Sequence, residues 1–171
     1  MNNFLKVVVA ASVAISLSSC LKDDEHFVDF AGSGYVAEIP YVANRSILKR
    51  DTVSLGAAST VRPLDINIAS PNPPTEAIQV GVVVDPAALT AYNKTIAKPY
   101  TLLPATAYQL PASVTINPGN RIGTINISYV GGQVPTTGGP YALPVTIQSV
   151  PSNVIISANY RTQILAVVMV K

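Results

Sequence analysis

Apolar and polar residues alternate in short runs along most of the chain. In "RPLDINIAS", Leu64, Ile66 and Ile68 alternate with polar neighbours. A period of two places the apolar side chains on one face of an extended chain, which predicts a half-buried β-strand. The run "IQVGVVVD" over residues 78–85 becomes apolar on both faces toward its end. This pattern is typical of a central strand that is covered on both sides.

Other segments extend the β pattern toward both ends of the chain. Residues 35–42, "YVAEIPYV", read as a strand that contains Pro40. Because proline cannot donate a ladder hydrogen bond, this strand is predicted at a sheet edge. Residues 113–120 and 121–130 are predicted to pair as a hairpin closed by a Pro-Gly turn. The runs "YALPVTIQSV" and "TQILAVVMVK" supply two later strands.

One short helix interrupts the strands. Asp85 is a suitable N-cap residue, and Pro86 fits the first helical position, where a missing N–H costs nothing. Leu89 and Tyr92 are three residues apart and share one helix face. The helix is expected to end near Asn93.

The strand count and the composition together indicate the fold class. About seven strands at a spacing of about 8–12 residues are typical of an all-β sandwich of two sheets. The chain also contains fourteen prolines, ten glycines and no tryptophan. A length of 171 residues suits one domain. We expect this domain to span residues 35–171.

The charge pattern argues against one class of partner. Charged residues make up 12% of the chain, and the formal net charge is +2. The eleven Lys and Arg residues are scattered rather than clustered. A nucleic-acid binder needs a basic stripe that releases counterions from phosphates, so no nucleic-acid partner is expected.

The N-terminus has the features of a cleaved signal peptide. The run "VVVAASVAISL" contains eleven apolar or small residues. This is the length of a signal-peptide core, and it is shorter than the roughly 20 residues of a membrane-spanning helix. The sequence Leu17-Ser18-Ser19-Cys20 follows it and resembles the bacterial lipobox. Residues 1–19 are therefore predicted to be removed, with Cys20 as the lipid-attached first residue of the mature protein.

A charged cluster follows the cysteine directly. Lys22, Asp23, Asp24 and Glu25 resemble the export signal of Bacteroidota lipoproteins. The resemblance implies a protein that is lipid-anchored to the outer membrane and faces the cell exterior. The alternative is that residues 20–34 form only a solvated tether between the anchor and the domain.

Several short motifs recur in one order between Val82 and Lys171: Asp85-Pro86 with Tyr92-Asn93, Leu103-Pro104, Pro118-Gly119, and Tyr141-Leu143-Pro144. This ordered set resembles the Bacteroidota domain of unknown function 1735, found near the N-terminus of many surface lipoproteins. The resemblance implies an immunoglobulin-like β-sandwich associated with glycan capture. Family members often continue into a carbohydrate-binding or glycoside hydrolase domain. This chain stops at Lys171, where the module ends, so no enzymatic role is expected from the resemblance.

The inventory of reactive residues also predicts a non-catalytic protein. The single histidine, His26, lies in the tether, and an acylated Cys20 leaves no free thiol. Ser-His-Asp catalysis, thiol chemistry and Cys/His zinc sites are therefore not expected, and no metal or cofactor is predicted. A glycosidase needs only two carboxylates, but each candidate in the domain has a structural explanation as a turn, strand-exterior or helix-cap residue: Asp51, Asp65, Glu76 and Asp85.

Glycan binding, or a role as an accessory of a glycan-uptake system, is the sharper functional hypothesis. Sugars stack on exposed aromatic rings, and polar side chains hydrogen-bond their hydroxyls. The chain has eight tyrosines. Tyr92, Tyr129 and Tyr141 are interpreted as core or sheet residues. Candidate glycan contacts lie near proline-rich loops or strand ends: Tyr100, Tyr108 and Tyr160.

A structural or adhesive role is the alternative hypothesis. The closing run "ILAVVMV" is apolar on both faces. It indicates either a central sandwich strand or a donor strand that completes a neighbouring subunit, as in pilus assembly. In the second case Arg45 or Arg50 would be a processing site, and neighbouring surface lipoproteins would be the partners. An unpaired terminal strand would favour this hypothesis.

One modification motif is present. Asp51-Thr52-Val53 matches the Asp-Ser/Thr-aliphatic pattern to which Bacteroidota attach O-glycans in exported proteins. Thr52 is therefore a candidate O-glycosylation site.

Overall fold

The computed structural model describes residues 34–171. The predicted signal peptide over residues 1–19, the lipid-attachment residue, the export cluster and the only histidine lie outside the described residues: Cys20, Lys22, Asp23, Asp24, Glu25 and His26. Within the part that is described, no helix is both long and apolar enough to cross a membrane.

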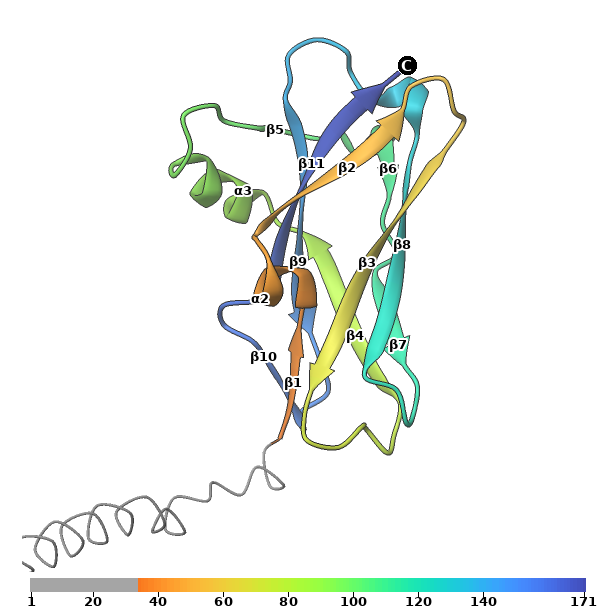
Figure 1. Cartoon of the computed structure of the whole chain (residues 1–171), viewed down its shortest axis with the longest axis vertical. Coiled ribbons are helices and arrows are strands. Elements are labelled where there is room, and N and C mark those ends of the chain that lie inside the picture. Colours follow the sequence, from red (N-terminus) through yellow and green to blue (C-terminus); the bar gives the residue numbers. More distant parts are fainter. Residues whose placement is uncertain (1–33) are drawn as a thin grey trace, which may run out of the picture. The chain divides into compact units, whose positions relative to one another are not determined.

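Two β-sheets form the domain, which confirms the predicted β-sandwich (Figure 1). The first sheet has the order β10 (Val154–Ile156), β1 (Tyr35–Glu38), β3 (Thr60–Ala69), β8 (Ile122–Tyr129) and β6 (Tyr108–Gln109). The second sheet has the order β2 (Leu48–Ser54), β11 (Thr162–Val170), β9 (Tyr141–Ser149), β4 (Ile78–Val84) and β7 (Ser113–Ile116). The short strand β5 (Thr101–Leu102) also pairs with β9. Several of these strands have only two to four residues, which is why the structure contains more strands than the sequence pattern predicts.

The connections include short helices: α2 (Pro40–Asn44), α3 (Pro86–Asn93), η2 (Ala105–Ala107) and η3 (Gly131–Gln133). Most neighbouring strands are antiparallel, but three pairs are parallel: β1 with β10, β2 with β11, and the short β5 with β9. The first strands of the domain are therefore joined to its last strands.

The core lies between the two sheets and follows the period of two. Leu64, Ile66 and Ile68 of β3 are at most 2% exposed, as the alternation predicts. On the neighbouring strand β8, Ile125 and Ile127 point into the same core. Burial of these large side chains stabilises the fold by roughly 1.5–3 kcal/mol each, which makes this layer the main source of stability.

The predicted hairpin over residues 113–130 is wrong. Strand β7 pairs with β4 in the second sheet, whereas β8 pairs with β3 and β6 in the first. The chain crosses from one sheet to the other at the Pro-Gly turn, where Gly119 has a φ of 80°. A Cβ atom on Gly123 would lie 2.8 Å from Cγ1 of Ile116, so the two strands pack face to face rather than edge to edge. In this arrangement Ile116 of β7 and both Ile125 and Ile127 of β8 are buried in the core between the sheets.

The predicted edge strand over residues 35–42 is also wrong. Strand β1 ends at Glu38 and lies between β10 and β3. Pro40 occupies the first position of α2 instead. Proline tolerates this position because its fixed φ suits a helix and the absent N–H has no partner there. The backbone N–H of Ile39 donates to the carbonyl of Tyr160 at 2.7 Å, which holds the end of β1 in place.

Helix α3 follows the prediction closely. The Oδ1 atom of Asp85 accepts a hydrogen bond from the backbone N–H of Ala88 at 3.1 Å. Leu89 is buried on the outer face of the second sheet, against Ala142 and Ile164. The helix therefore covers part of the face that points away from the main core.

The terminal strand β11 is paired on both sides. It pairs with β2 over residues 164–170 and with β9 over residues 162–166. The apolar run is thus explained by a position inside the sheet. The unpaired terminal strand that would favour assembly by strand donation is not found in residues 34–171.

Candidate functional site

The three tyrosines predicted as glycan contacts lie in different parts of the fold. Tyr100 follows α3 and packs on the outer face of the second sheet. Tyr108 is in β6 and packs against the main core. Tyr160 lies in the connection before β11 and is 39% exposed. The structure does not bring them into one groove.

A small cavity lies elsewhere, between α2, β2 and β3. Its volume is about 290 Å³, at the small end of protein ligand pockets, which span roughly 300–1,000 Å³. We call it the α2 pocket. Its lining combines an aromatic ring, an amide, two cations, a carboxylate and apolar groups: Tyr41, Asn44, Arg45, Lys49, Asp65, Pro40, Pro63 and Leu64.

Helix α2 supplies one wall of this pocket. Tyr41 and Asn44 are three residues apart and share one side of the helix, and Arg45 follows as the C-cap residue. The Nδ2 atom of Asn44 donates to the carbonyl of Pro40 at 2.9 Å, which fixes the amide. Arg45 is exposed, and no carboxylate among residues 34–171 pairs with it. Its guanidinium can therefore donate to a ligand.

Lys49 on β2 supplies the floor of the pocket. Its Nζ atom donates to the carbonyl of Pro63 at 2.7 Å and lies 3.7 Å from Oδ1 of Asp51. The same Nζ atom lies 5.9 Å from the centroid of the Tyr41 ring. Such cation–π contacts contribute about 0.5–1 kcal/mol where they are exposed. Lys49 therefore contacts the Tyr41 ring and joins β2, at the edge of the second sheet, to β3 of the first sheet.

Asp65 on β3 supplies the opposite wall. It is exposed, and its Oδ1 atom accepts a hydrogen bond from Oγ1 of Thr124 at 2.7 Å. The other carboxylate oxygen has no partner among the described residues and can accept from a ligand hydroxyl. The pocket thus presents both donors and acceptors around an aromatic ring.

A buried polar contact supports the pocket from inside. Asp51 is 2% exposed, and its Oδ2 atom accepts a hydrogen bond from the hydroxyl of Tyr129 at 2.9 Å. Burial raises the pKa of Tyr129 far above its ordinary value, and the charge of Asp51 and this hydrogen bond raise it further. The tyrosine therefore stays neutral and the contact joins β2 of one sheet to β8 of the other.

The remaining carboxylates have separate structural positions. Asp85 caps α3, and Glu76 lies in the loop between β3 and β4. Within residues 34–171 no group of three His, Cys, Asp or Glu residues could hold a metal ion.

The sequence matches a family model described as "-like, N-terminal domain" over residues 35–154, which is more than half of the 171 residues. The chain belongs to this family. No curated protein is similar enough to the chain to match it.

Solved structures from Bacteroides share the fold of this family member. A multidomain protein from Bacteroides ovatus that includes the domain of unknown function 1735 superposes with a TM-score of 0.62 at 18% identity, covering 80% of this chain and 45% of that one. The resemblance to this domain is thereby confirmed. An auxiliary nutrient binding protein from Bacteroides thetaiotaomicron gives 0.60 at 17% identity, covering 72% and 44%.

A third structure of this fold belongs to a protein crystallised with a sugar product. EndoBT-3987 from Bacteroides thetaiotaomicron, with its Man5GlcNAc product, gives a TM-score of 0.61 at 20% identity, covering 78% of this chain and 30% of that one. The chain thus spans less than half the length of these relatives.

Sequence reasoning missed the wall that this family member builds from α2. The sequence pattern predicts one strand over residues 35–42, which includes Tyr41, and predicts no helix over the residues that follow. A usable signal is present in the sequence, because Pro40 in the first position of a helix puts Tyr41 and Asn44 on one face.

Proposed function

We propose that this domain is a non-catalytic glycan-binding module of a surface lipoprotein and that the α2 pocket is its binding site. The observation that carries the proposal is the convergence of the Tyr41 ring, the Asn44 amide, the Arg45 guanidinium and the Asp65 carboxylate on one small cavity. A sugar ring offers an apolar face for an aromatic side chain and hydroxyls that both donate and accept hydrogen bonds. This set of side chains matches those needs.

The neighbours of the same fold support a glycan-related role. One is described as an auxiliary nutrient binding protein, and another holds a Man5GlcNAc product. Because the chain covers 44% and 30% of these two proteins, their complete activities are not transferred to it. The carboxylates of the domain favour a binding role, since Asp51 is buried against Tyr129 and Asp85 caps a helix.

A glycan array tests the function. The mature chain carries the change Cys20→Ala, which removes the acyl attachment and keeps the protein soluble without detergent. We expect selective binding to a small set of glycans. An array on which no glycan binds would contradict the proposed function.

Paired substitutions test the site. For each glycan that binds, titration calorimetry compares Asn44→Ala and Arg45→Ala with the controls Asn120→Ala and Arg161→Ala, which change exposed residues outside the lining of the α2 pocket. We expect the pocket variants to weaken binding about tenfold or more, which corresponds to about 1.4 kcal/mol, and the controls to bind as the parent does. Unchanged binding in both pocket variants would remove the α2 pocket as the site.

We further propose that the protein is anchored at the cell surface. The lipobox ending in Cys20 and the cluster Lys22, Asp23, Asp24 and Glu25 support this proposal. Each buried CH₂ group of an acyl chain contributes about 0.8 kcal/mol, so several chains give a stable anchor. Cys20→Ala should move the protein from the membrane to the soluble fraction. Replacing Asp23, Asp24 and Glu25 by alanine should leave the protein in the membrane but keep it inside the cell envelope. Protease added to intact cells should then no longer digest it.

Thr52 remains the proposed O-glycosylation site. Its side chain is exposed on β2, while Asp51 and Val53 on either side of it point inward. Mass spectrometry of protein from the native outer membrane should find the added mass on the peptide that contains Thr52. A peptide that is entirely unmodified would reject the site.

A further inference from the structure

A pair of tyrosines lies on the outer face of the second sheet, where α3 ends. The ring centroids of Tyr92 and Tyr100 are 6.4 Å apart, and the ring planes are inclined by 33°. Both side chains are half-buried, so part of each ring is open to solvent. They rest on the small cluster of Leu89, Ala142 and Ile164. We call this surface the tyrosine face.

The tyrosine face is held in a fixed arrangement. The Nδ2 atom of Asn93 donates to the carbonyl of Tyr100 at 2.8 Å. In return, the backbone N–H of Tyr100 donates to Oδ1 of Asn93 at 2.9 Å. These two bonds close the loop over residues 94–99 into a ring. A surface that is already ordered loses little conformational entropy when a ligand binds, which favours affinity.

Arg50 lies beside this aromatic pair. On β2 it is two residues beyond Leu48, which packs on the same cluster, and the sheet register places it opposite Ala166. Burial raises the pKa of Tyr92, and the nearby Tyr100 raises it further, whereas the positive charge of Arg50 lowers it. The positive charge of Arg50 therefore interacts electrostatically with the Tyr92 hydroxyl.

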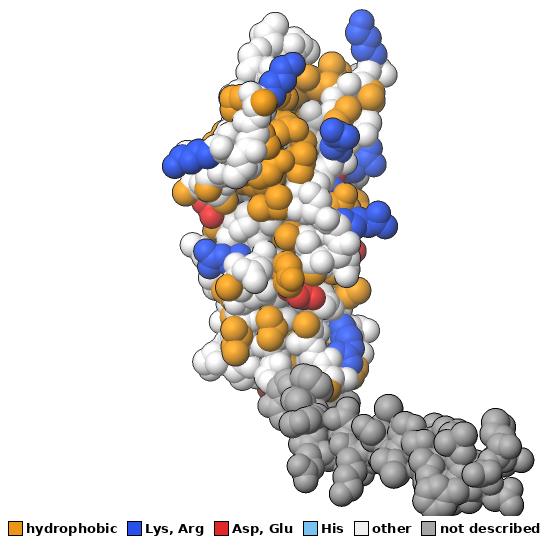
Figure 2. All heavy atoms as spheres, turned by 60° about the vertical axis from the view of Figure 1, so that its left-hand side comes forward, with side chains coloured by type: hydrophobic (Ala, Val, Ile, Leu, Met, Phe, Trp, Pro, Cys, Tyr) orange, Lys and Arg blue, Asp and Glu red, His pale blue; other side chains and the backbone are white. Residues whose placement is uncertain are grey.

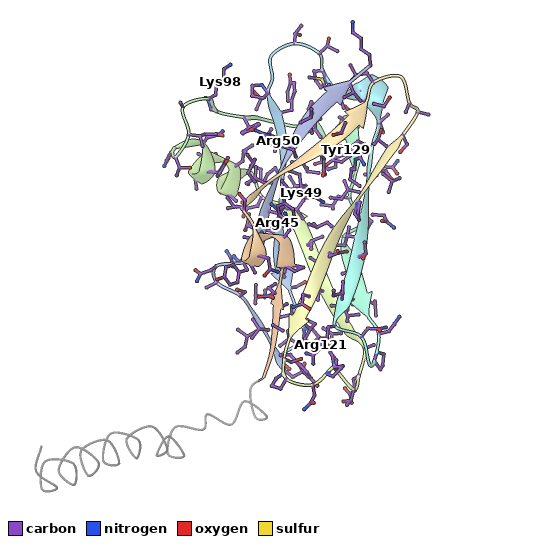
Figure 3. The ribbon with its side chains drawn as sticks, in the orientation of Figure 1. Arg45, Lys49, Arg50, Lys98, Arg121 and Tyr129 are labelled. Atoms are coloured by element: carbon purple, nitrogen blue, oxygen red, sulfur yellow. The ribbon has the colours of Figure 1, made fainter. Side chains whose placement is uncertain are left out.

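The surroundings of Arg50 are basic. Lys94 and Lys98 lie at the end of α3 and in the following loop, and Figure 3 labels Arg50 and Lys98 on this side of the domain. In the described part of the chain the carboxylates lie elsewhere, on the first sheet, in the core, in the β3–β4 loop or at the opposite end of α3: Glu38, Asp65, Asp51, Glu76 and Asp85. The only ion pair among residues 34–171 joins Lys49 to Asp51. No carboxylate among residues 34–171 pairs with the cations of the tyrosine face.

Apolar side chains extend the tyrosine face. Leu102 of β5 is 37% exposed, and Val168 of β11 is 39% exposed. Figure 2 shows apolar side chains gathered on the upper part of this side, with basic side chains at their margin. The surface therefore combines ring faces, apolar contact area and unneutralised cations.

We propose that the tyrosine face binds an acidic polysaccharide built from uronic acid residues. The pyranose rings stack on Tyr92 and Tyr100, and a ring carboxylate accepts hydrogen bonds from the Arg50 guanidinium, whose planar fork matches a carboxylate. Lys98 lies in reach of a neighbouring sugar along the chain. A neutral glycan would use the rings and leave the cations without a counter-charge, so the unneutralised basic surroundings select the acidic class.

This face is separate from the α2 pocket. Successive residues of a strand point to opposite faces, so Lys49 faces the pocket and the core while Arg50 faces outward. The tyrosine face can therefore bind its ligand even if the α2 pocket binds none.

Titration calorimetry of the mature Cys20→Ala chain with polygalacturonate and polymannuronate tests the proposal. Methyl-esterified polygalacturonate is the matched ligand control, because it keeps the rings and removes the charge. Arg50→Gln and Tyr100→Ala should each weaken binding about tenfold or more. Arg161→Gln and Tyr160→Ala remove the same groups at exposed positions elsewhere, and they should change binding less than about twofold. Circular dichroism with thermal unfolding establishes that each variant is folded.

Each alternative outcome overturns the proposal. No binding of either acidic polymer, or equal binding of the ester, would show that the face does not select uronic acids. An equal loss in Arg161→Gln would indicate diffuse charge attraction instead of a site. Asn44→Ala, in the α2 pocket, should bind these polymers normally. If it does not, the polymers bind the pocket and the tyrosine face is not the site.

Discussion

Strand β2 carries charged side chains on both of its faces. The charges on the inner face are paired, and the charge on the outer face is not paired with any carboxylate among residues 34–171. On the inner face, Asp51 is 2% exposed, accepts a hydrogen bond from Tyr129 at 2.9 Å, and lies 3.7 Å from Lys49. On the outer face, Arg50 is exposed and has no carboxylate partner among residues 34–171. The same seven-residue strand therefore contains a charge that serves the fold and a charge that is available to a ligand.

The difference follows from the cost of burying charge. A buried carboxylate without partners is strongly destabilising, so Asp51 is retained only with hydrogen-bond donors around it. An exposed cation keeps its hydration and costs little when it is unpaired. On this strand the buried, hydrogen-bonded charge of Asp51 thus has a structural role. The exposed charge of Arg50, unpaired within residues 34–171, is available for binding.

Replacing the buried carboxylate is the strongest test of this comparison. Asp51→Ala leaves the Tyr129 hydroxyl buried without its acceptor and Lys49 without its counter-charge. We expect the free energy of unfolding to fall by about 2–4 kcal/mol. Urea denaturation measures the change, and Thr52→Ala on the outer face should stay within about 0.5 kcal/mol of the parent. Equal stability of the two variants would remove the distinction between the faces.

Removing only the hydroxyl gives a smaller effect that depends on pH. Tyr129→Phe leaves Asp51 buried with one donor fewer, and should cost about 1–3 kcal/mol at pH 7. The raised pKa of Tyr129 means that the folded state holds the proton more tightly than the unfolded state. Its contribution is complete below pH of about 10, the ordinary tyrosine value, and is lost as the pH rises above it.

The difference in stability between the parent and Tyr129→Phe should therefore narrow above pH 10, by up to about 1.4 kcal/mol per pH unit. Urea denaturation at pH 8, 10 and 11 measures it. A difference that is constant across these three pH values would contradict a buried, neutral Tyr129.

Sequence patterns predict the elements of this molecule better than their partners. The alternation around Leu64 and the cap at Asp85 are local properties, and both appear in the structure as expected. The pairing of residues 113–130 was predicted wrongly, because a Pro-Gly turn has the same local signal in a hairpin and in a crossing between sheets. The prediction of Asp51 as a turn or strand-exterior residue is wrong, because its carboxylate is buried against Tyr129, which is 78 residues away and has no local signal.

The candidate sites were harder to predict for the same reason. The α2 pocket joins Tyr41, Lys49 and Asp65 from three elements, and the tyrosine face joins β2 to the end of α3. Tyr100 was identified from its position near a loop, but Arg50 beside it depends on the sheet register. Sites that combine residues from several elements can be identified only once the tertiary structure is known.

The edge of β2 lies between the inner and outer faces of the strand. A substitution there is expected to change the stability by an intermediate amount. The Nε and Nη2 atoms of Arg62 donate to the carbonyl of Thr52 at 2.8 and 2.5 Å. These hydrogen bonds occupy a backbone carbonyl that would otherwise be free to pair with another strand. Arg62→Gln should lower the free energy of unfolding by about 0.5–1.5 kcal/mol. It should also increase self-association, because unpaired strand edges recruit other strands. Light scattering at increasing concentration measures this, with Arg161→Gln as the control, and an entirely monomeric Arg62→Gln would show that the edge is protected by other means.

The smallest change in stability is expected on the outer face itself. Arg50→Gln removes a cation that no carboxylate in the described part of the chain pairs with, so the free energy of unfolding should change by less than about 0.5 kcal/mol. The same variant is expected to lose about tenfold in affinity for polygalacturonate. Urea denaturation and calorimetry on one preparation measure both quantities. A loss of stability comparable to that of Asp51→Ala would mean that Arg50 also serves the fold, and the contrast between the two faces of β2 would then disappear.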